Sequence, residues 1–95
     1  MTREEAIATI GEVIRQVQEA GGHERPEVTA ELCPLRDLAG FDSMLGIVAT
    51  GFVAAVIGCE IPPEVNLFVE KNRRLTLAEA AAKLCTVVAP MEATR

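Results

Sequence analysis

The feature that most constrains the fold is a long stretch without any charged residue, Leu45 to Cys59. Asp42 and Ser43 come directly before it, and Gly58 lies near its end. The pattern predicts a helix from about Ser43 to Ile57 that Asp42 or Ser43 caps and Gly58 stops. The large apolar residues of this helix point in more than one direction, so one buried stripe does not account for all of them: Met44, Ile47, Val48, Phe52, Val53, Val56 and Ile57.

The uncharged stretch is below the usual length of a membrane-spanning helix, and it includes glycines. We therefore expect no membrane span. Ser43 is a candidate modification site, because the electropositive N-terminus of a helix suits an attached anionic group. The alternative is that Asp42 and Ser43 form an ordinary helix cap.

Two further helices are predicted from capping boxes. In the first box the residues are Thr2 and Glu5, and the helix behind it continues to the glycine pair 21–22. Its apolar positions recur at helical spacing: Ile7, Ile10, Val13, Ile14 and Val17. In the second box the residues are Thr76 and Glu79, and the helix is expected to run to about Val87, with Pro90 ending it.

The segments between the helices complete the predicted architecture. His23 to Phe41 is expected to be a long ordered loop, with room for a short helical turn, that lies across the bundle. Glu64 to Val69 is expected to form a short helix, and Lys71 to Arg74 a basic, solvated linker. We therefore predict one all-α domain, residues 1–95, that folds as a small four-helix bundle with three main helices, one short helix and a long first loop.

Composition narrows the classes of function. The net charge of −5 repels phosphate backbones, so we expect no nucleic-acid partner. The three cysteines, Cys33, Cys59 and Cys85, lack metal-ligand spacing and accompany one histidine, so no metal site is expected. We interpret them as reduced thiols of a cytoplasmic protein. The N-terminal residues do not resemble a secretory signal.

Three segments together resemble acyl carrier proteins over nearly the whole chain. The first is Leu38-Ala-Gly-Phe-Asp-Ser-Met44, at the end of the long loop. The second is Ile57-Gly-Cys-Glu-Ile-Pro62, and the third is Leu75-Thr-Leu-Ala-Glu-Ala-Ala81. The order and spacing of the three segments match the family, which implies the carrier-type bundle.

The resemblance implies a specific chemistry. Ser43 would carry a 4′-phosphopantetheine arm, transferred from coenzyme A by a phosphopantetheinyl transferase, and the arm would hold acyl groups as thioesters. Asp42 would cap the helix and assist recognition by the transferase. The chain itself would hold no catalytic residue and would serve partner enzymes, namely acyl-loading ligases or synthases. The Gly-Phe-Asp-Ser sequence is closer to acyl carriers than to aminoacyl or peptidyl carriers.

The chain departs from the family in the helix that follows Ser43. Fatty-acid carriers have acidic residues there, whereas the expected outward positions here are Leu45, Val48, Ala54 and Ala55. The pathway is therefore expected to be a specialised fatty-acid, polyketide or lipid-tailoring one. Met44, which replaces the usual leucine, and Leu45, Val48 and Phe52 are the candidate partner contacts.

Several alternatives stay open at this point. The apolar side chains could form an exposed docking patch, could be covered by the long loop, or could join two copies in a weak dimer, although we expect a monomer. The chain could also be an unmodified interaction module with a carrier-like fold. The cluster Lys71, Arg73 and Arg74 could contact the phosphate of the arm. His23 has no nucleophile placed beside it, so an independent enzyme is not expected.

Overall fold

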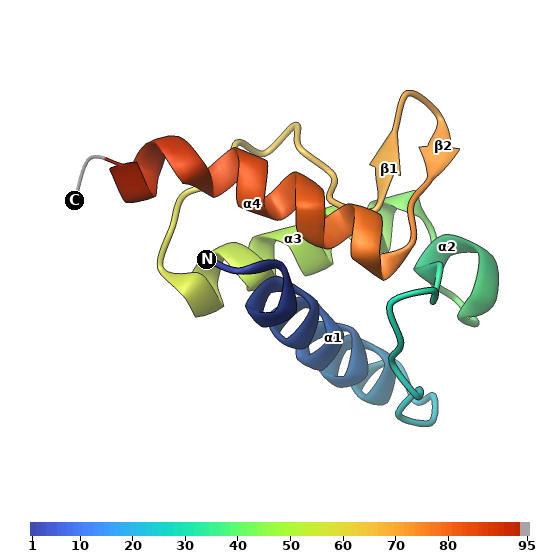
Figure 1. The fold of residues 1–95 in the computed structure, drawn as a ribbon. Coiled ribbons are helices and arrows are strands. Elements are labelled where there is room, and N and C mark those ends of the chain that lie inside the picture. Colours follow the sequence, from blue (N-terminus) through green and yellow to red (C-terminus); the bar gives the residue numbers. More distant parts are fainter. Residues whose placement is uncertain (94–95) are drawn as a thin grey trace.

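The computed structural model describes the backbone of residues 1–93 and the side chains of residues 1–90. Within these residues the fold is mainly helical, with one small antiparallel sheet (Figure 1). The elements in chain order are α1 (Arg3–Ala20), α2 (Pro34–Asp37), α3 (Ser43–Ile57), β1 (Val69–Glu70), β2 (Arg73–Arg74) and α4 (Leu77–Ala93). The prediction of a small helical fold is confirmed at this level.

Both predicted capping boxes are present. At the start of α1, Thr2 Oγ1 accepts a hydrogen bond from the Glu5 N–H at 3.1 Å, and Glu5 Oε1 accepts one from the Thr2 N–H at 2.9 Å. At the start of α4, Glu79 Oε1 accepts from the Thr76 N–H at 2.9 Å, and Thr76 Oγ1 accepts from the Glu79 N–H at 3.3 Å. Each box satisfies two backbone groups that a helix end leaves free.

Helix α3 begins and ends at the predicted residues. Asp42 is the cap, because its Oδ1 accepts a hydrogen bond from the Leu45 N–H at 2.9 Å. Gly58 ends the helix in the left-handed conformation, with φ of 70°, and its N–H donates to the Ala54 carbonyl. None of the helices that the structure describes is long and apolar enough to cross a membrane.

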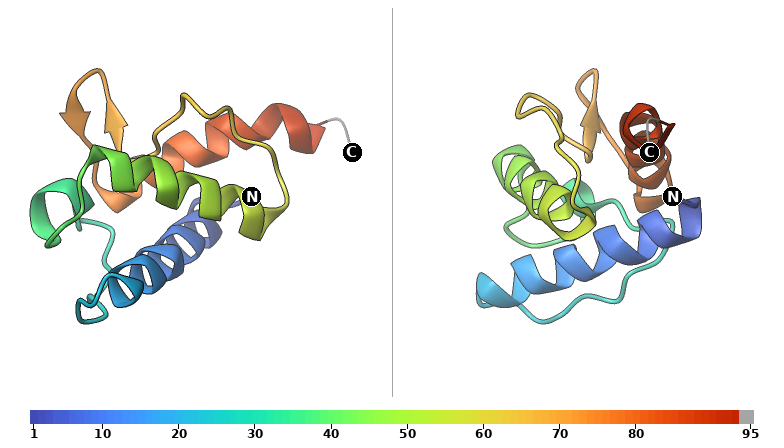
Figure 2. Two further views of the ribbon diagram at one scale, coloured as in Figure 1. Left: turned by 180° about the vertical axis from the view of Figure 1, so that it is seen from behind. Right: turned by 90° about the vertical axis from the view of Figure 1, so that its left-hand side faces the viewer.

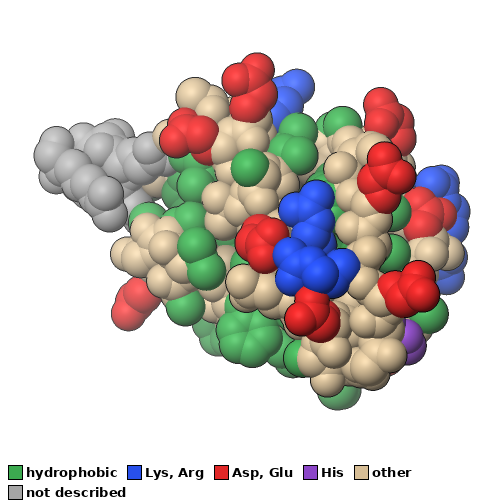
Figure 3. All heavy atoms as spheres, turned by 90° about the horizontal axis from the view of Figure 1, so that it is seen from below, with side chains coloured by type: hydrophobic (Ala, Val, Ile, Leu, Met, Phe, Trp, Pro, Cys, Tyr) green, Lys and Arg blue, Asp and Glu red, His purple; other side chains and the backbone are tan. Residues whose placement is uncertain are grey.

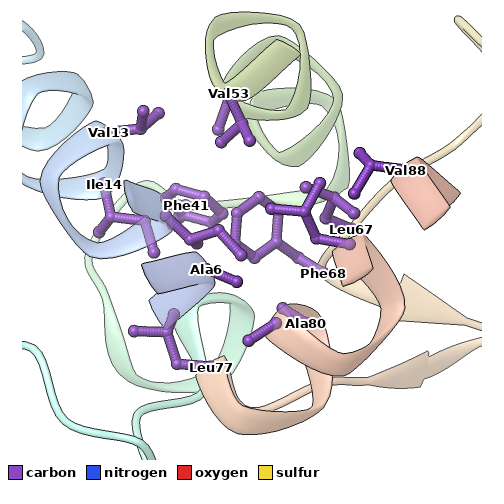
Figure 4. Packing of buried hydrophobic residues seen from close by; sticks show 14 residues of the cluster. Ala6, Val13, Ile14, Phe41, Val53, Leu67, Phe68, Leu77, Ala80 and Val88 are labelled. Carbon is purple, nitrogen blue, oxygen red and sulfur yellow. The ribbon is translucent and has the colours of Figure 1, made fainter. Parts of the chain in front are cut away.

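The three long helices enclose one apolar core. Helix α1 packs against both α3 and α4, and Figure 2 shows the three helices around a common centre. Phe41 and Phe68 meet edge to face near this centre, with ring centroids 5.3 Å apart (Figure 4). Their companions in the buried cluster are Ala6, Ile10, Val13, Ile14, Ala49, Val53, Leu67, Leu77, Ala80, Ala81, Leu84 and Val88.

The long first loop lies across the bundle as predicted. The Leu77 N–H donates to the Leu32 carbonyl at 2.8 Å, and the Ala78 N–H donates to the Ala30 carbonyl at 2.9 Å. These two bonds fix the loop to the first turn of α4. The loop contains the short helix α2, which begins with the buried Pro34.

The predicted helix over 64–69 is wrong. The chain makes turns there and then enters a hairpin, with Val69 opposite Arg74 and Glu70 opposite Arg73. Lys71 and Asn72 form the two-residue connection, with φ of 50° and 65°. Positive φ at both positions is the conformation of a tight hairpin turn, which asparagine tolerates well. The segment 71–74, predicted to be a linker, is therefore part of this hairpin.

The predicted end of the last helix is also wrong. Helix α4 continues through Pro90 to Ala93. Val88 is buried in the core two residues before the proline, so packing holds the turn that leads into it. This tertiary contact offsets the hydrogen bond that proline cannot donate.

Glu79 makes the stability of the fold sensitive to acid. Hydrogen bonds from the Thr76 N–H and from Arg73 lower the pKa of Glu79 from 4.5 to about 2. A carboxyl group with a lowered pKa stabilises the folded state above its unfolded pKa, and this contribution is lost as the pH falls from about 4.5 toward 2. We expect Glu79→Gln to flatten the fall of the urea midpoint over this pH range.

The matched control is Glu27→Gln. Glu27 is also exposed, and no described residue forms a hydrogen bond or an ion pair with its side chain. This variant should keep the wild-type pH dependence. An equal flattening in both variants would contradict the role of the capping box.

Candidate functional site

Ser43 is the first residue of α3, and its side chain is exposed. It is the only serine in the chain. Because Asp42 supplies the cap, the helix does not use the Ser43 hydroxyl, and this hydroxyl has no hydrogen-bond partner among the described residues. The hydroxyl is therefore available to solvent at the electropositive end of the helix.

Asn66 fixes the start of α3 from one side. Its Nδ2 donates to the Ser43 carbonyl at 2.9 Å, and its Oδ1 accepts from the Phe68 N–H at 3.0 Å. One side chain thus connects the residue that begins α3 to the turn before β1. The close approach requires Gly46, since a Cβ at that position would lie 2.8 Å from Asn66 Oδ1.

Thr50 makes a second connection, one helical turn beyond Gly46. Its buried Oγ1 donates to the Gly46 carbonyl at 2.8 Å and accepts from the Leu67 N–H at 3.1 Å. From the opposite side, Lys83 of α4 donates to the carbonyls of Asn66 and Val69, both at 2.9 Å. The turn over 66–69 is thereby held between α3 and α4.

Phe41 fixes the chain on the other side of Ser43. Phe41 is 3% exposed, and its ring packs against that of Phe68. Before it, Gly40 has a φ of 71°, and a Cβ there would lie 3.0 Å from the His23 ring. His23 itself is exposed and, like Gly40, belongs to the loop surface. Ser43 is therefore an exposed residue that lies between the buried Phe41 and the hydrogen-bonded Asn66.

The outward side of α3 exposes large apolar side chains. The exposed fractions are 74% for Met44, 47% for Ile47, 45% for Val48, 52% for Phe52 and 65% for Val56. These residues, together with the exposed Gly51 and Ala55, are called the α3 face below. The long loop does not cover them, and in the view from behind α3 lies in front of the other helices (Figure 2, left).

The predicted partner contacts fall on this face with one exception. Met44, Val48 and Phe52 are exposed members of it, whereas Leu45 is half-buried against the core. Of the other predicted outward positions, Ala55 is exposed and Ala54 is partly buried. The sequence pattern located the face but missed Ile47 and Val56, whose exposure depends on how the helix packs.

The ion pairs among the described residues all lie outside α3. Arg25 forms ion pairs with Glu12 at 3.1 Å and with Glu19 at 2.9 Å, and Figure 3 shows basic side chains beside acidic ones on the side seen from below. In the hairpin, Arg73 pairs with Glu79 at 2.6 Å. This pair engages one member of the basic cluster that the sequence offered as a phosphate contact.

Three residues that hold Ser43 in place were not recognised in the sequence. Gly46 and Thr50 stood within the uncharged stretch as ordinary helix positions, and Asn66 stood within a segment predicted to be helical. Thr50, a polar residue inside an apolar helix, was the one available signal. A buried hydroxyl needs a hydrogen-bond partner, so its presence indicates a contact with another segment. That partner, the Leu67 N–H, comes from a distant part of the chain.

Comparison with known proteins found no relative of this chain. No family model, no curated protein and no solved structure matches the chain.

The close contact between Asn66 and α3 can be tested with two matched glycine substitutions. Gly46→Ala places a Cβ against Asn66, so it should weaken the bonds to Ser43 and lower the free energy of unfolding by roughly 1–2 kcal/mol, measured by urea denaturation. Gly51→Ala meets nothing within 4 Å and should instead stabilise the helix by roughly 0.5–1 kcal/mol. A stabilising Gly46→Ala would contradict the described packing.

Proposed function

We propose that the chain is an acyl carrier protein that carries acyl groups as thioesters on a 4′-phosphopantetheine arm attached to Ser43. The observation that carries the proposal is the exposed and unbonded Ser43 hydroxyl at the start of α3, between the buried Phe41 and the Asn66 bridge. The resemblance of the segments around Ser43, Cys59 and Thr76 to acyl carriers supports the same conclusion. The acyl groups would belong to a specialised fatty-acid, polyketide or lipid-tailoring pathway.

The physical setting suits such an attachment. A phosphodiester keeps one negative charge, and a helix N-terminus favours a nearby negative charge by roughly 0.3–1 kcal/mol at an exposed site. Asp42 satisfies the Leu45 N–H, and the remaining free N–H groups of the first turn are available to the phosphate. The arm, rather than the protein, would supply the reactive thiol.

Partner enzymes would dock by apolar contact. The partners of such a carrier are its phosphopantetheinyl transferase and the ligases or synthases that load acyl groups. Met44 directly follows Ser43, so an enzyme that reaches the hydroxyl also meets the α3 face. Because this helix carries no charge, binding should depend weakly on ionic strength.

A second candidate function is an unmodified interaction module. The observation that favours it is the same exposed α3 face, since soluble proteins rarely expose large contiguous apolar patches without a binding role. In this case Asp42 and Ser43 would serve only to begin the helix. The two candidates differ in whether Ser43 accepts the arm.

Intact mass spectrometry separates the two. We expect the protein incubated with coenzyme A, Mg²⁺ and a promiscuous phosphopantetheinyl transferase to gain the mass of one phosphopantetheine group. Ser43→Ala should gain nothing, and Thr9→Ala, a hydroxyl removal on α1, should gain the group as the wild type does. Modification that persists in Ser43→Ala would contradict the assigned site.

No mass gain with several transferases, in a protein whose circular dichroism shows the folded state, would favour the interaction module. The transferase reaction on a known carrier, run in parallel, shows that the enzyme and the coenzyme A are active.

The proposed role of Asp42 in transferase recognition can be tested separately from its role as the cap of α3. Asp42→Asn keeps a side-chain oxygen that can cap α3, so thermal stability should change little. The substitution removes the carboxylate charge, so we expect the initial rate of Ser43 modification to fall about tenfold or more, as loss of a charged contact in a reactive complex does. An unchanged rate would confine Asp42 to the capping role.

A further inference from the structure

The α3 face is an uncharged surface on an acidic protein. The chain has a net charge of −5, yet α3 contains no charged residue from Ser43 to Ile57. A surface that covers it gains nothing from charges and must desolvate any charge that it brings. The favoured occupant is therefore a second surface that is equally apolar and uncharged.

The apolar area of the face limits how stable an interface it can form. At roughly 100 Å² for each large side chain, the five exposed residues would bury at most on the order of 500 Å² on each of two partners. A total of about 1,000 Å² belongs to weak and transient interfaces, below the roughly 1,600 Å² of a standard stable complex. The face is thus large enough for a reversible pair and too small for an obligate one.

Gly51 gives the face a shape that fits its own copy. It lies near the middle of α3, is exposed, and has open space where a Cβ would be. Two helices that cross at this glycine can approach closely. In an antiparallel pair centred there, Ile47 of one copy lies opposite Ala55 of the second, and Met44 lies opposite Gly58.

The pairing therefore sets Met44 and Ile47, two large side chains of the face, against small residues on both halves of the interface. A two-fold axis requires such self-complementarity, because every contact is made twice. We propose that two copies of this chain associate reversibly through their α3 faces, antiparallel and crossing at Gly51. The inference does not depend on modification of Ser43, because it concerns the unmodified chain.

Sedimentation equilibrium of the unmodified protein tests the association. We expect the average mass to rise from one chain toward two between about 10 µM and 1 mM, the range suited to a weak interface. Ala55→Glu introduces a charge in the middle of the face and should keep the protein monomeric throughout. Ala8→Glu makes the same change on the exposed side of α1 and should leave the association unchanged.

Cysteine cross-linking tests the geometry. Under mild oxidation Gly51→Cys should give a covalent dimer, because the axis brings the two residues 51 together. In Ala55→Cys the two thiols would lie about 12 Å apart along the helix axes, from a rise of 1.5 Å per residue, so cross-linking should be at least tenfold less. The unsubstituted chain, oxidised in parallel, reports any cross-linking of the native cysteines.

Each adverse result overturns the proposal. A wild-type protein that stays monomeric to 1 mM would show that the α3 face does not bind a second copy. An association that survives Ala55→Glu, or that Ala8→Glu abolishes equally, would place the contact elsewhere. Equal cross-linking at residues 51 and 55 would exclude the antiparallel crossing. None of these results bears on whether Ser43 accepts phosphopantetheine, which the mass measurement decides separately.

Discussion

The position of Ser43 depends on the hydrogen bonds that connect the turn before β1 to the first two turns of α3. Asn66 binds the Ser43 carbonyl, and Thr50 accepts from the Leu67 N–H. These bonds matter because the buried side of α3 is small: Gly46, Ala49, Thr50 and Val53. Such residues bury little apolar area, so packing alone holds this helix less firmly than a stripe of leucines would.

Helix α3 thus reverses the usual distribution of side chains. Its small residues face the core, and most of its large apolar residues face solvent. The small inner side lets Phe68 and Leu67 come close to the helix, and the outer side is left for contacts with other molecules. Ala49 of α3 and Ala81 of α4 are both fully buried in this core.

The helix ends were predictable because their causes are local. Thr2 with Glu5, Asp42, Gly58, and Thr76 with Glu79 act within a few residues of themselves, and each bond is present in the structure. The orientation of α3 was not predictable, because an apolar residue at every turn leaves the buried side undetermined. Only contacts with Asn66 and Leu67, more than fifteen residues away, select the side of small residues.

The hairpin after α3 was missed for a related reason. Its strands are two residues long, so no alternation of polar and apolar residues can reveal them. What fixes the segment is Lys83, whose ammonium group binds two carbonyls of the turn from α4. Pro90 shows the reverse case, where a strong local signal to end a helix is outweighed by the burial of Val88.

The two proposals are compatible in one geometric respect. In an antiparallel pair crossing at Gly51, the two residues 43 stand about 24 Å apart along the helix axes, at 1.5 Å per residue. This separation is about three Debye lengths at physiological ionic strength, so the phosphates of two modified chains would barely repel each other. Modification would therefore leave the pair intact, whereas an enzyme that covers Met44 on its way to the arm would displace the second copy. Acyl loading and self-association would then compete for the same apolar face, and the concentration of the partner enzyme would decide between them.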